Sequence, residues 1–298
     1  GVVLAYRKKY LLGGIITALF IALQIQSNHI QMSYYFMFVI LFFVGAYFED
    51  AYRKKELPHF FKASGVLALA AVVGVCINIS NLYHTYEYSK ETMRGKSELK
   101  QEGAAASQTS SGLDRDYITN WSYGIGETLT LLVPNVKGGG SGSTMSQSEA
   151  AMAKANPMYN GIYSQLPQYF GEQPWTAGPV YVGAFVMFLF VLGCFIVKGP
   201  LKWALLGATI FSILLSWGKN FMGLTDFFID YVPMYNKFRA VSSILVIAEF
   251  TIPLLAIFAL KEILNKPDTL KLKENRGGVI ATLVLTAGVA LILAVAPG

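Results

Sequence analysis

The sequence predicts an all-α, polytopic membrane protein with about seven transmembrane helices and one long, partly ordered extracytoplasmic loop. Only 14% of the 298 residues are charged and 54% are hydrophobic, whereas soluble domains carry about 25% charged residues. The apolar residues gather in long stretches, and lysines and arginines gather in the short segments between alternate stretches. Together these observations favour helices that cross a bilayer.

Seven apolar stretches approach the roughly 20 residues needed to cross about 30 Å of hydrocarbon at about 1.5 Å per residue. They are 10–27, 32–48, 63–82, 179–197, 201–217, 240–260 and 277–296. We expect each stretch to form one spanning helix. Three then lie within 1–82 and four within 179–298, and 83–178 is the long loop between the two groups.

The positions of the basic residues predict the orientation. Fourteen of the 24 lysines and arginines lie in the short segments 1–9, 49–62, 198–202 and 261–276. By the positive-inside rule these segments are cytoplasmic, which places 83–178 outside. The net charge of +6 is explained by basic loops beside anionic headgroups, so no nucleic-acid partner is predicted.

The loop 83–178 is too long for a plain connection, and its composition changes along its length. Two segments, 103–112 and 137–154, are rich in small residues and predict flexible tethers. Two others, 117–134 and 157–178, are rich in Tyr, Trp, Gly and Pro and predict ordered aromatic patches.

An amphipathic segment follows the fifth stretch, with apolar residues at helical spacing near 221–232. It predicts a helix in the outer membrane interface. Asp226 and Asp230 are one helical turn apart on it. They form either a solvated face or a pair of ligands for a cation.

Polar residues also mark the outer ends of the first three stretches. Gln24, Asn28, Gln31 and Tyr35 follow helical spacing through the turn 28–31, with His29 beside them. Either they form a cleft that hydrogen-bonds a phosphate or a sugar, or they cap a tight turn. The cleft would use Asn28, His29 and Gln31.

His84 and Glu87 stand three residues apart beyond the third stretch, among several tyrosines. A histidine held by a carboxylate acts as a base or a metal ligand, but an interfacial aromatic belt explains the same residues. With three histidines in all, the ligand spacing supports no metal site, and the cofactor, including a divalent metal, stays open.

The sixth stretch carries charges at its mouth and in its middle. Lys237 and Arg239 stand at the outer end, where they either bind a lipid phosphate or extend to headgroups in general. Glu249 lies near the middle, four residues before Pro253, which is expected to kink the helix. Glu249 either lines a cavity or is satisfied by a neighbouring helix, for example through Asn78.

Five motifs in order cover essentially the whole chain and resemble the bacterial YfhO family. They are SNHIQMSYY at 27–35, LLVPN at 131–135 before a Gly/Ser run, QYFGEQP at 168–174, GPVYVG at 178–183 and PMYNKFR at 233–239. The resemblance implies a GT-C-like fold in the bacterial inner membrane. It also implies transfer of a sugar from a polyprenyl-phosphate donor to a cell-envelope acceptor on the outer face.

The resemblance also places a catalytic acid in a first outer loop that would precede Gly1, so we expect the chain to be an internal fragment without the catalytic base. Chemistry and location then suggest the remaining roles. Arg239 and Lys237 suit the donor phosphate, and His84 and Glu87 are contributors to catalysis at most. The expected sugar or acceptor contacts are Asn28, His29, Gln31, Trp121, Tyr123, Tyr169 and Trp175.

Two other functions stay open at this point. A lipid or polysaccharide transporter needs a continuous polar path, whereas the polar residues here collect on the outer side. A non-catalytic membrane scaffold predicts that no single polar residue at the mouth matters. In each case the expected partners include membrane lipid, and the enzyme adds a carrier-linked sugar and its acceptor.

Overall fold

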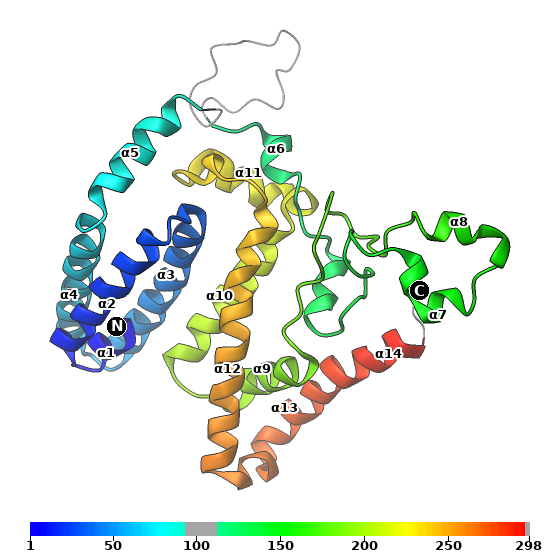
Figure 1. The fold of residues 1–298 in the computed structure, drawn as a ribbon. Helices are drawn as coiled ribbons and strands as arrows, with labels where there is room; N and C mark the ends of the chain where they lie inside the picture. Colours follow the sequence, from blue (N-terminus) through cyan, green and yellow to red (C-terminus); the bar gives the residue numbers. More distant parts are fainter. Residues whose placement is uncertain (93–111, 296–298) are drawn as a thin grey trace.

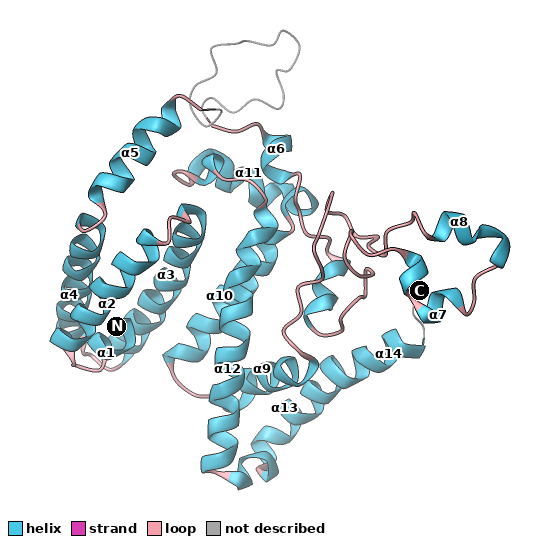
Figure 2. Ribbon diagram, in the orientation of Figure 1, coloured by secondary structure: helices cyan, strands magenta, loops and turns pink. Residues whose placement is uncertain are grey.

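The computed structural model describes residues 1–92 and 112–295, and helices are the only regular elements that they form (Figures 1 and 2). The longer helices are α2 (Tyr10–Gln26), α3 (Ile30–Arg53), α4 (Leu57–Cys76), α5 (Ile79–Lys90), α9 (Ala184–Ile196), α10 (Pro200–Ser216), α11 (Met222–Tyr231), α12 (Val246–Asn265) and α13 (Lys273–Leu283). The shorter ones are α1 (Val2–Tyr6), α6 (Arg115–Thr119), α7 (Glu149–Met152), α8 (Asn160–Tyr163) and α14 (Val289–Val295).

Four helical segments of the described chain are long and apolar enough to cross a membrane, so the prediction of a helical membrane protein is confirmed at that level. They are Ile30–Arg53, Leu57–Cys76, Val241–Asn265 and Lys273–Val295. The last joins α13 and α14 through a π-helical turn at Val284–Gly288. Two other apolar helices, α2 and α9, have only 17 and 13 residues. Seven crossings therefore stay a prediction.

The fifth predicted stretch continues into a sharp bend. Helix α10 ends at Ser216, and the chain turns by 108° into the segment that contains α11. Gly218 makes the turn with φ +45°, and a Cβ there would lie 2.1 Å from Ser122 Oγ, so no other residue fits. The predicted amphipathic helix is present as α11, and its position in the membrane interface stays a prediction.

The third stretch is displaced from its predicted bounds. Helix α4 begins at Leu57, where Pro58 fits the first turn of a helix, and it ends at Cys76. The residues after Asn78 belong to α5, which has no buried residue. The predicted end of this span, at 82, therefore lies one turn inside α5.

Two cores hold the helices together. The larger core joins α3, α9, α10, α11 and α12, and the smaller one joins α1, α3 and α4. Figure 1 shows α12 beside α10, with α2, α3 and α4 to one side and α9 and α13 near the lower end of α12. Gly193 permits the close approach of α9 to α12, because a Cβ there would lie 3.1 Å from Leu255.

The outer surface of the bundle is strongly apolar. Leu11, Leu69 and Ile292 expose 78%, 66% and 66% of their surface, and many other large apolar side chains do the same. A soluble protein rarely exposes so much contiguous apolar surface. This surface is what a helix bundle presents to lipid.

Residues 112–178 fold into short helices and loops. The Gly/Ser run expected as a tether makes backbone hydrogen bonds at both ends: Phe170 N–H donates to Lys137 O at 3.0 Å, and Ser141 N–H donates to Thr176 O at 2.8 Å. Gly138 is required there, since its φ is +80° and a Cβ would meet Gln168 O. The other predicted tether, 103–112, lies outside the described residues except for Gly112.

Candidate functional site

The loop between α11 and α12 carries Arg239 and is held from one side by α3. The Gln31 side-chain amide donates to the backbone carbonyl of Arg239 at 2.7 Å and to the Tyr35 hydroxyl at 2.9 Å. The Tyr34 hydroxyl donates to the Pro233 carbonyl at 2.9 Å. Residues 30–35 therefore fix the backbone on which Arg239 stands.

The same loop contains two residues in a left-handed backbone conformation. Met234 has φ +66° and Ala240 has φ +57°. Such conformations are unfavourable for residues with a Cβ, and they persist where surrounding contacts determine the backbone. Ala240 directly follows Arg239 in the chain, so its unfavourable backbone conformation indicates that the surrounding contacts hold the turn at Arg239 in one conformation.

The opposite side of the loop is held by the segment around α6. Arg239 Nη1 donates to the Tyr117 hydroxyl at 2.6 Å, and the guanidinium lies 5.5 Å and 5.9 Å from the ring centres of Tyr117 and Trp121. Both distances are typical of cation–π contacts. The Arg239 side chain is nevertheless exposed. Its remaining N–H groups are therefore available to an anion from outside.

Trp121 joins this cationic site to the second aromatic patch. Its indole N–H donates to the Trp175 carbonyl at 3.1 Å, and its own carbonyl accepts the Ser242 N–H at 3.0 Å. The Ser242 hydroxyl donates to Gln173 Oε1 at 3.2 Å. The beginning of the sixth span and the motif at 168–174 are thus tied together.

A buried carboxylate, Glu127, organises the patch behind these residues. It is only 3% exposed, and its oxygens accept hydrogen bonds from the Tyr169 hydroxyl at 2.6 Å and the Gly124 N–H at 2.6 Å. The Tyr169 oxygen in turn accepts the Gln173 N–H at 2.8 Å. Sequence reasoning missed Glu127. The sequence feature that could have indicated Glu127 is its isolation, because no other charged residue stands between Asp116 and Lys137.

The tyrosines around Glu127 hold their protons tightly. Burial raises the pKa of Tyr169, and so does donation of its proton to Glu127. Burial also raises the pKa of Tyr123 to about 12; its hydrogen bond with Thr130 lowers the pKa, and the charges of Glu127 and Glu249 raise it. Both phenols are therefore donors, not bases, near neutral pH.

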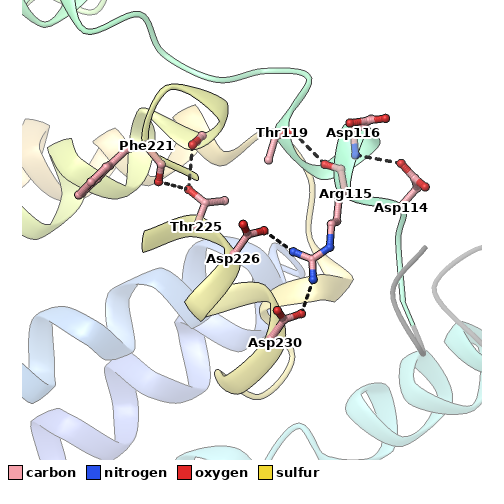
Figure 3. A network of polar contacts seen from close by, with 9 residues as sticks. Asp114, Arg115, Asp116, Thr119, Phe221, Thr225, Asp226 and Asp230 are labelled. Carbon is pink, nitrogen blue, oxygen red and sulfur yellow. Dashed lines mark hydrogen bonds and ion pairs between the residues drawn. The ribbon is translucent and has the colours of Figure 1, made fainter. Parts of the chain in front are cut away.

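The side chain of Arg115 joins α6 to α11 (Figure 3). The Arg115 guanidinium binds Asp226 through Nη1 and Asp230 through Nη2, the latter at 2.6 Å. The hydrogen bond to Asp230 is the main cause of a raised pKa of Arg115. The two carboxylates are therefore neither a freely solvated face nor a pair of ligands for a free cation, because the guanidinium of Arg115 from α6 binds both.

Asn28 and His29 lie away from this site, at the turn between α2 and α3. Asn28 adopts φ +60° and its side-chain oxygen accepts from Asn81 at 3.4 Å. The helix is interrupted there, so the predicted continuous face from Gln24 to Tyr35 is wrong; only its last part, the pair of Gln31 and Tyr35, is present. His29 is exposed just before α3.

His84 and Glu87 are also separate. Both lie on α5, where Glu87 accepts from Lys90 at 2.7 Å and the His84 ring packs against Tyr83 with 5.8 Å between ring centres. Among the described contacts, no hydrogen bond joins His84 to Glu87. In the described chain no three side chains of His, Cys, Asp or Glu are arranged to hold a metal ion.

Glu249 lies in the first turn of α12 and is exposed. Asn78, suggested as its partner, donates instead to the Ala22 carbonyl at 3.0 Å. Helix α12 continues through Pro253 as one element. Glu249 lies eight residues after the beginning of the apolar segment Val241–Asn265, near enough to Tyr123 that its charge raises the pKa of that phenol.

The structure therefore brings together Arg239, Gln31, Trp121 and Trp175 through direct contacts, and Tyr123 and Tyr169 through Glu127. Lys237 lies on the same loop, and burial lowers its pKa. Comparisons of the chain with protein-family models, curated proteins and solved structures gave no match. The functional proposal accordingly rests on this site and on the five sequence motifs.

Proposed function

We propose that the chain is part of a GT-C-like glycosyltransferase of the YfhO type in the bacterial inner membrane. It would transfer a sugar from a polyprenyl-phosphate carrier to a cell-envelope acceptor on the outer face. The observation that supports this most is the position of Arg239. Its exposed guanidinium packs against Tyr117 and Trp121 at the mouth of α12, on a backbone that α3 holds in place.

A guanidinium in this position suits the phosphate of a membrane-bound carrier. Two of its N–H groups match two phosphate oxygens, and the charge persists at every physiological pH. The aromatic rings and the hydrogen bond to Tyr117 restrict the guanidinium before the ligand arrives, which lowers the entropic cost of binding. Lys237, from the same loop, adds a second positive charge.

The aromatic side chains next to Arg239 suit the sugar. Trp121 touches the guanidinium, and Trp175, bonded to Trp121 through its carbonyl, exposes 57% of its surface. Indole rings stack on the flat apolar faces of sugars, and polar groups at the ring edges bind hydroxyls. A phosphate on Arg239 would therefore place the attached sugar beside these rings.

In the proposed reaction, the bond between the sugar C1 and the carrier phosphate oxygen breaks as an acceptor hydroxyl oxygen bonds to C1. The hydroxyl proton passes to a base, and the carrier leaves as a phosphate with one more negative charge. Arg239 stabilises this charge, so its contribution grows towards the transition state. None of the described residues is assigned as the base.

The test is transfer of radiolabelled sugar from an undecaprenyl-phosphate donor by the purified full-length protein. We expect Arg239→Ala to abolish transfer, and Arg239→Lys to keep a small part of it because an ammonium cannot bind phosphate in the same forked way. Arg276→Ala is the control, since Arg276 is an exposed arginine at the start of the last span. Full activity of folded Arg239→Ala would refute the proposal.

A further inference from the structure

A cavity of about 390 Å³ opens at the end of the bundle opposite to Arg239. It lies between the turn after α1, the end of α3, the beginning of α4 and the turn between α9 and α10. Positive side chains dominate its wall: Arg7, Lys8, Lys54 and Lys198 line it, against Asp50 and Glu56. All of these come from segments that the distribution of basic residues places on the cytoplasmic side.

Two of these four cations are already neutralised. Lys8 pairs with Glu56 at 3.3 Å, and Lys54 pairs with Asp50 at 2.7 Å. Within residues 1–92 and 112–295, no carboxylate lies at ion-pair distance from Arg7 or Lys198. The cavity therefore presents two positive charges that its own acids do not balance.

An apolar groove of about 800 Å³ continues from this cavity. The cavity and the groove share Asp50, Gly199 and Pro200 in their walls. The groove runs between α3 and α10 and reaches Phe228 of α11. Its wall is mainly aromatic and aliphatic, with Phe38, Leu41, Phe42, Trp203 and Phe211.

The groove is long enough for a lipid chain. From Arg53 to Phe38 its wall follows fifteen residue steps of α3, or about 22 Å at about 1.5 Å per residue. This is most of the roughly 30 Å thickness of the hydrocarbon core. Gly45 in the middle leaves open space, since a Cβ there would meet no atom within 4 Å.

We propose that the cavity and groove together bind one anionic glycerophospholipid of the inner leaflet, with its phosphate between Arg7 and Lys198 and an acyl chain along the groove that α3 and α10 form. Charge selects the headgroup, since basic pockets between transmembrane helices on the cytoplasmic side bind anionic lipid. The groove selects a lipid over a soluble phosphate because it extends into the membrane. The site shares no residue with the Arg239 site, and the proposed lipid binding does not rest on the proposed transfer reaction.

The lipid would also have a structural effect. Helix α3 carries Gln31 at one end and the cavity residues Tyr47 and Asp50 towards the other, and α10 forms the other groove wall. Phe38 and Phe42 of α3 already pack against Phe211 of α10 and form the floor of the groove, so the chain would lie along its open side and contact both helices. Occupancy of the inner-leaflet site would thus support the same helix that holds the Arg239 loop.

Trp203 provides a direct measurement, because it lines the groove and exposes 62% of its surface. The full-length protein is reconstituted in phosphatidylcholine bilayers that contain a small fraction of brominated phosphatidylglycerol or brominated phosphatidylcholine. Bromine quenches nearby tryptophan fluorescence, and the Trp203 signal is the difference between the protein and its Trp203→Phe variant. We expect phosphatidylglycerol to quench Trp203 at about 25-fold lower mole fraction, since each cation contributes roughly fivefold.

Separate substitutions test the cationic cavity and the apolar groove. Arg7→Ala with Lys198→Ala should remove the preference for phosphatidylglycerol, whereas Lys261→Ala with Arg276→Ala, basic residues outside the cavity, should retain it. Gly45→Leu should also remove it by filling the groove, without loss of helix propensity in α3. Gly65→Leu is its control, because Gly65 also faces open space but lies outside the groove.

Three results would overturn the proposal. The first is equal quenching by the two lipids. The second is a preference that survives either the double alanine variant or Gly45→Leu in folded protein. The third is loss of the preference on addition of millimolar glycerol 3-phosphate, which would identify a site for a soluble phosphate; we expect this compound to leave the preference intact.

Discussion

The Gln31 side chain donates to the backbone carbonyl of Arg239 at 2.7 Å, although the two residues are 208 positions apart. This hydrogen bond joins the beginning of α3 to the mouth of α12. It holds the backbone of a cation whose side chain remains exposed beside the rings of Tyr117 and Trp121. The site thus combines a fixed main chain with an accessible charge.

The first prediction concerns that hydrogen bond. Gln31→Ala should lower kcat/KM for the carrier-linked sugar about fivefold, because a hydrogen bond of this kind contributes about 1 kcal/mol. Gln24→Ala is the matched control, since Gln24 bonds to Ser33 at 3.3 Å and does not touch the Arg239 loop. Equal losses in the two variants would show that the turn as a whole matters, not the contact with Arg239.

The second prediction concerns Glu127. Glu127→Gln should destabilise the aromatic patch by about 1–3 kcal/mol, because an amide cannot accept both the Tyr169 hydroxyl and the Gly124 N–H as the carboxylate does. The measurement is thermal unfolding in detergent, followed by tryptophan fluorescence. Glu172→Gln, at an exposed neighbouring acid, should leave the midpoint unchanged. A midpoint for Glu127→Gln equal to that of the unmodified protein would contradict a structural role for the carboxylate.

The third prediction is a pH dependence. Folding raises the pKa of Tyr123 to about 12, so the folded protein retains a proton that the unfolded chain releases near pH 10. The associated stabilisation is complete below pH 10 and is lost between about pH 10 and 12, at up to about 1.4 kcal/mol for each pH unit. Chemical unfolding at several alkaline pH values measures this slope.

Replacement of the phenol tests the assignment. Tyr123→Phe removes one titrating group and should make the alkaline slope less steep, with the contribution of Tyr169 remaining, although the variant also loses the hydrogen bond to Thr130 and is less stable at neutral pH. Tyr88→Phe, at a tyrosine that is 74% exposed on α5, serves as the control. An unchanged slope in Tyr123→Phe would assign the pH dependence to another group.

The fourth prediction concerns the contact of Arg115 with α11. Arg115→Ala should reduce stability by about 1 kcal/mol, since the pairs are partly exposed and screened, and it leaves Asp226 and Asp230 to repel each other. Arg115→Lys should recover only part of this, because an ammonium lacks the forked geometry. Thermal unfolding at low and high salt measures both effects.

The double variant Asp226→Asn with Asp230→Asn separates attraction from repulsion. In that background, Arg115→Ala should have little further effect, because the charges that bind it are gone. A full additional loss would mean that Arg115 stabilises the protein through packing and not through the two carboxylates.

Much of the membrane architecture was predictable because hydrocarbon imposes a length and a composition on the chain. The stretches near 32–48, 240–260 and 277–296 correspond to helices long enough to cross the membrane. The sequence predicts one uninterrupted spanning helix at 201–217. The sharp bend after it depends on Gly218, whose neighbour Ser122 comes from a distant part of the sequence.

The site was only partly predictable, because it too depends on contacts between residues that are distant in the sequence. Residue type and sequence position predict Arg239, Lys237 and Trp121 as site residues, and the structure brings Arg239 and Trp121 into contact. Spacing along one helix cannot show which segment of a long loop packs back against the bundle. The ion pairs of Arg115 with Asp226 and Asp230 are therefore not predictable from the sequence. Helical spacing wrongly predicts one continuous helix face across Asn28, because the left-handed backbone conformation of Asn28 interrupts the helix there.

The most direct test of the central claim is the affinity of the purified full-length protein for undecaprenyl phosphate without a sugar. It is measured at equilibrium in detergent for the unmodified protein, Arg239→Ala and the control Arg276→Ala. Loss of a charge-assisted contact of about 1.5–3 kcal/mol predicts that Arg239→Ala binds roughly 10- to 150-fold more weakly, with Arg276→Ala unchanged. Equal affinity of Arg239→Ala and the unmodified protein would contradict the assignment of Arg239 to the carrier phosphate.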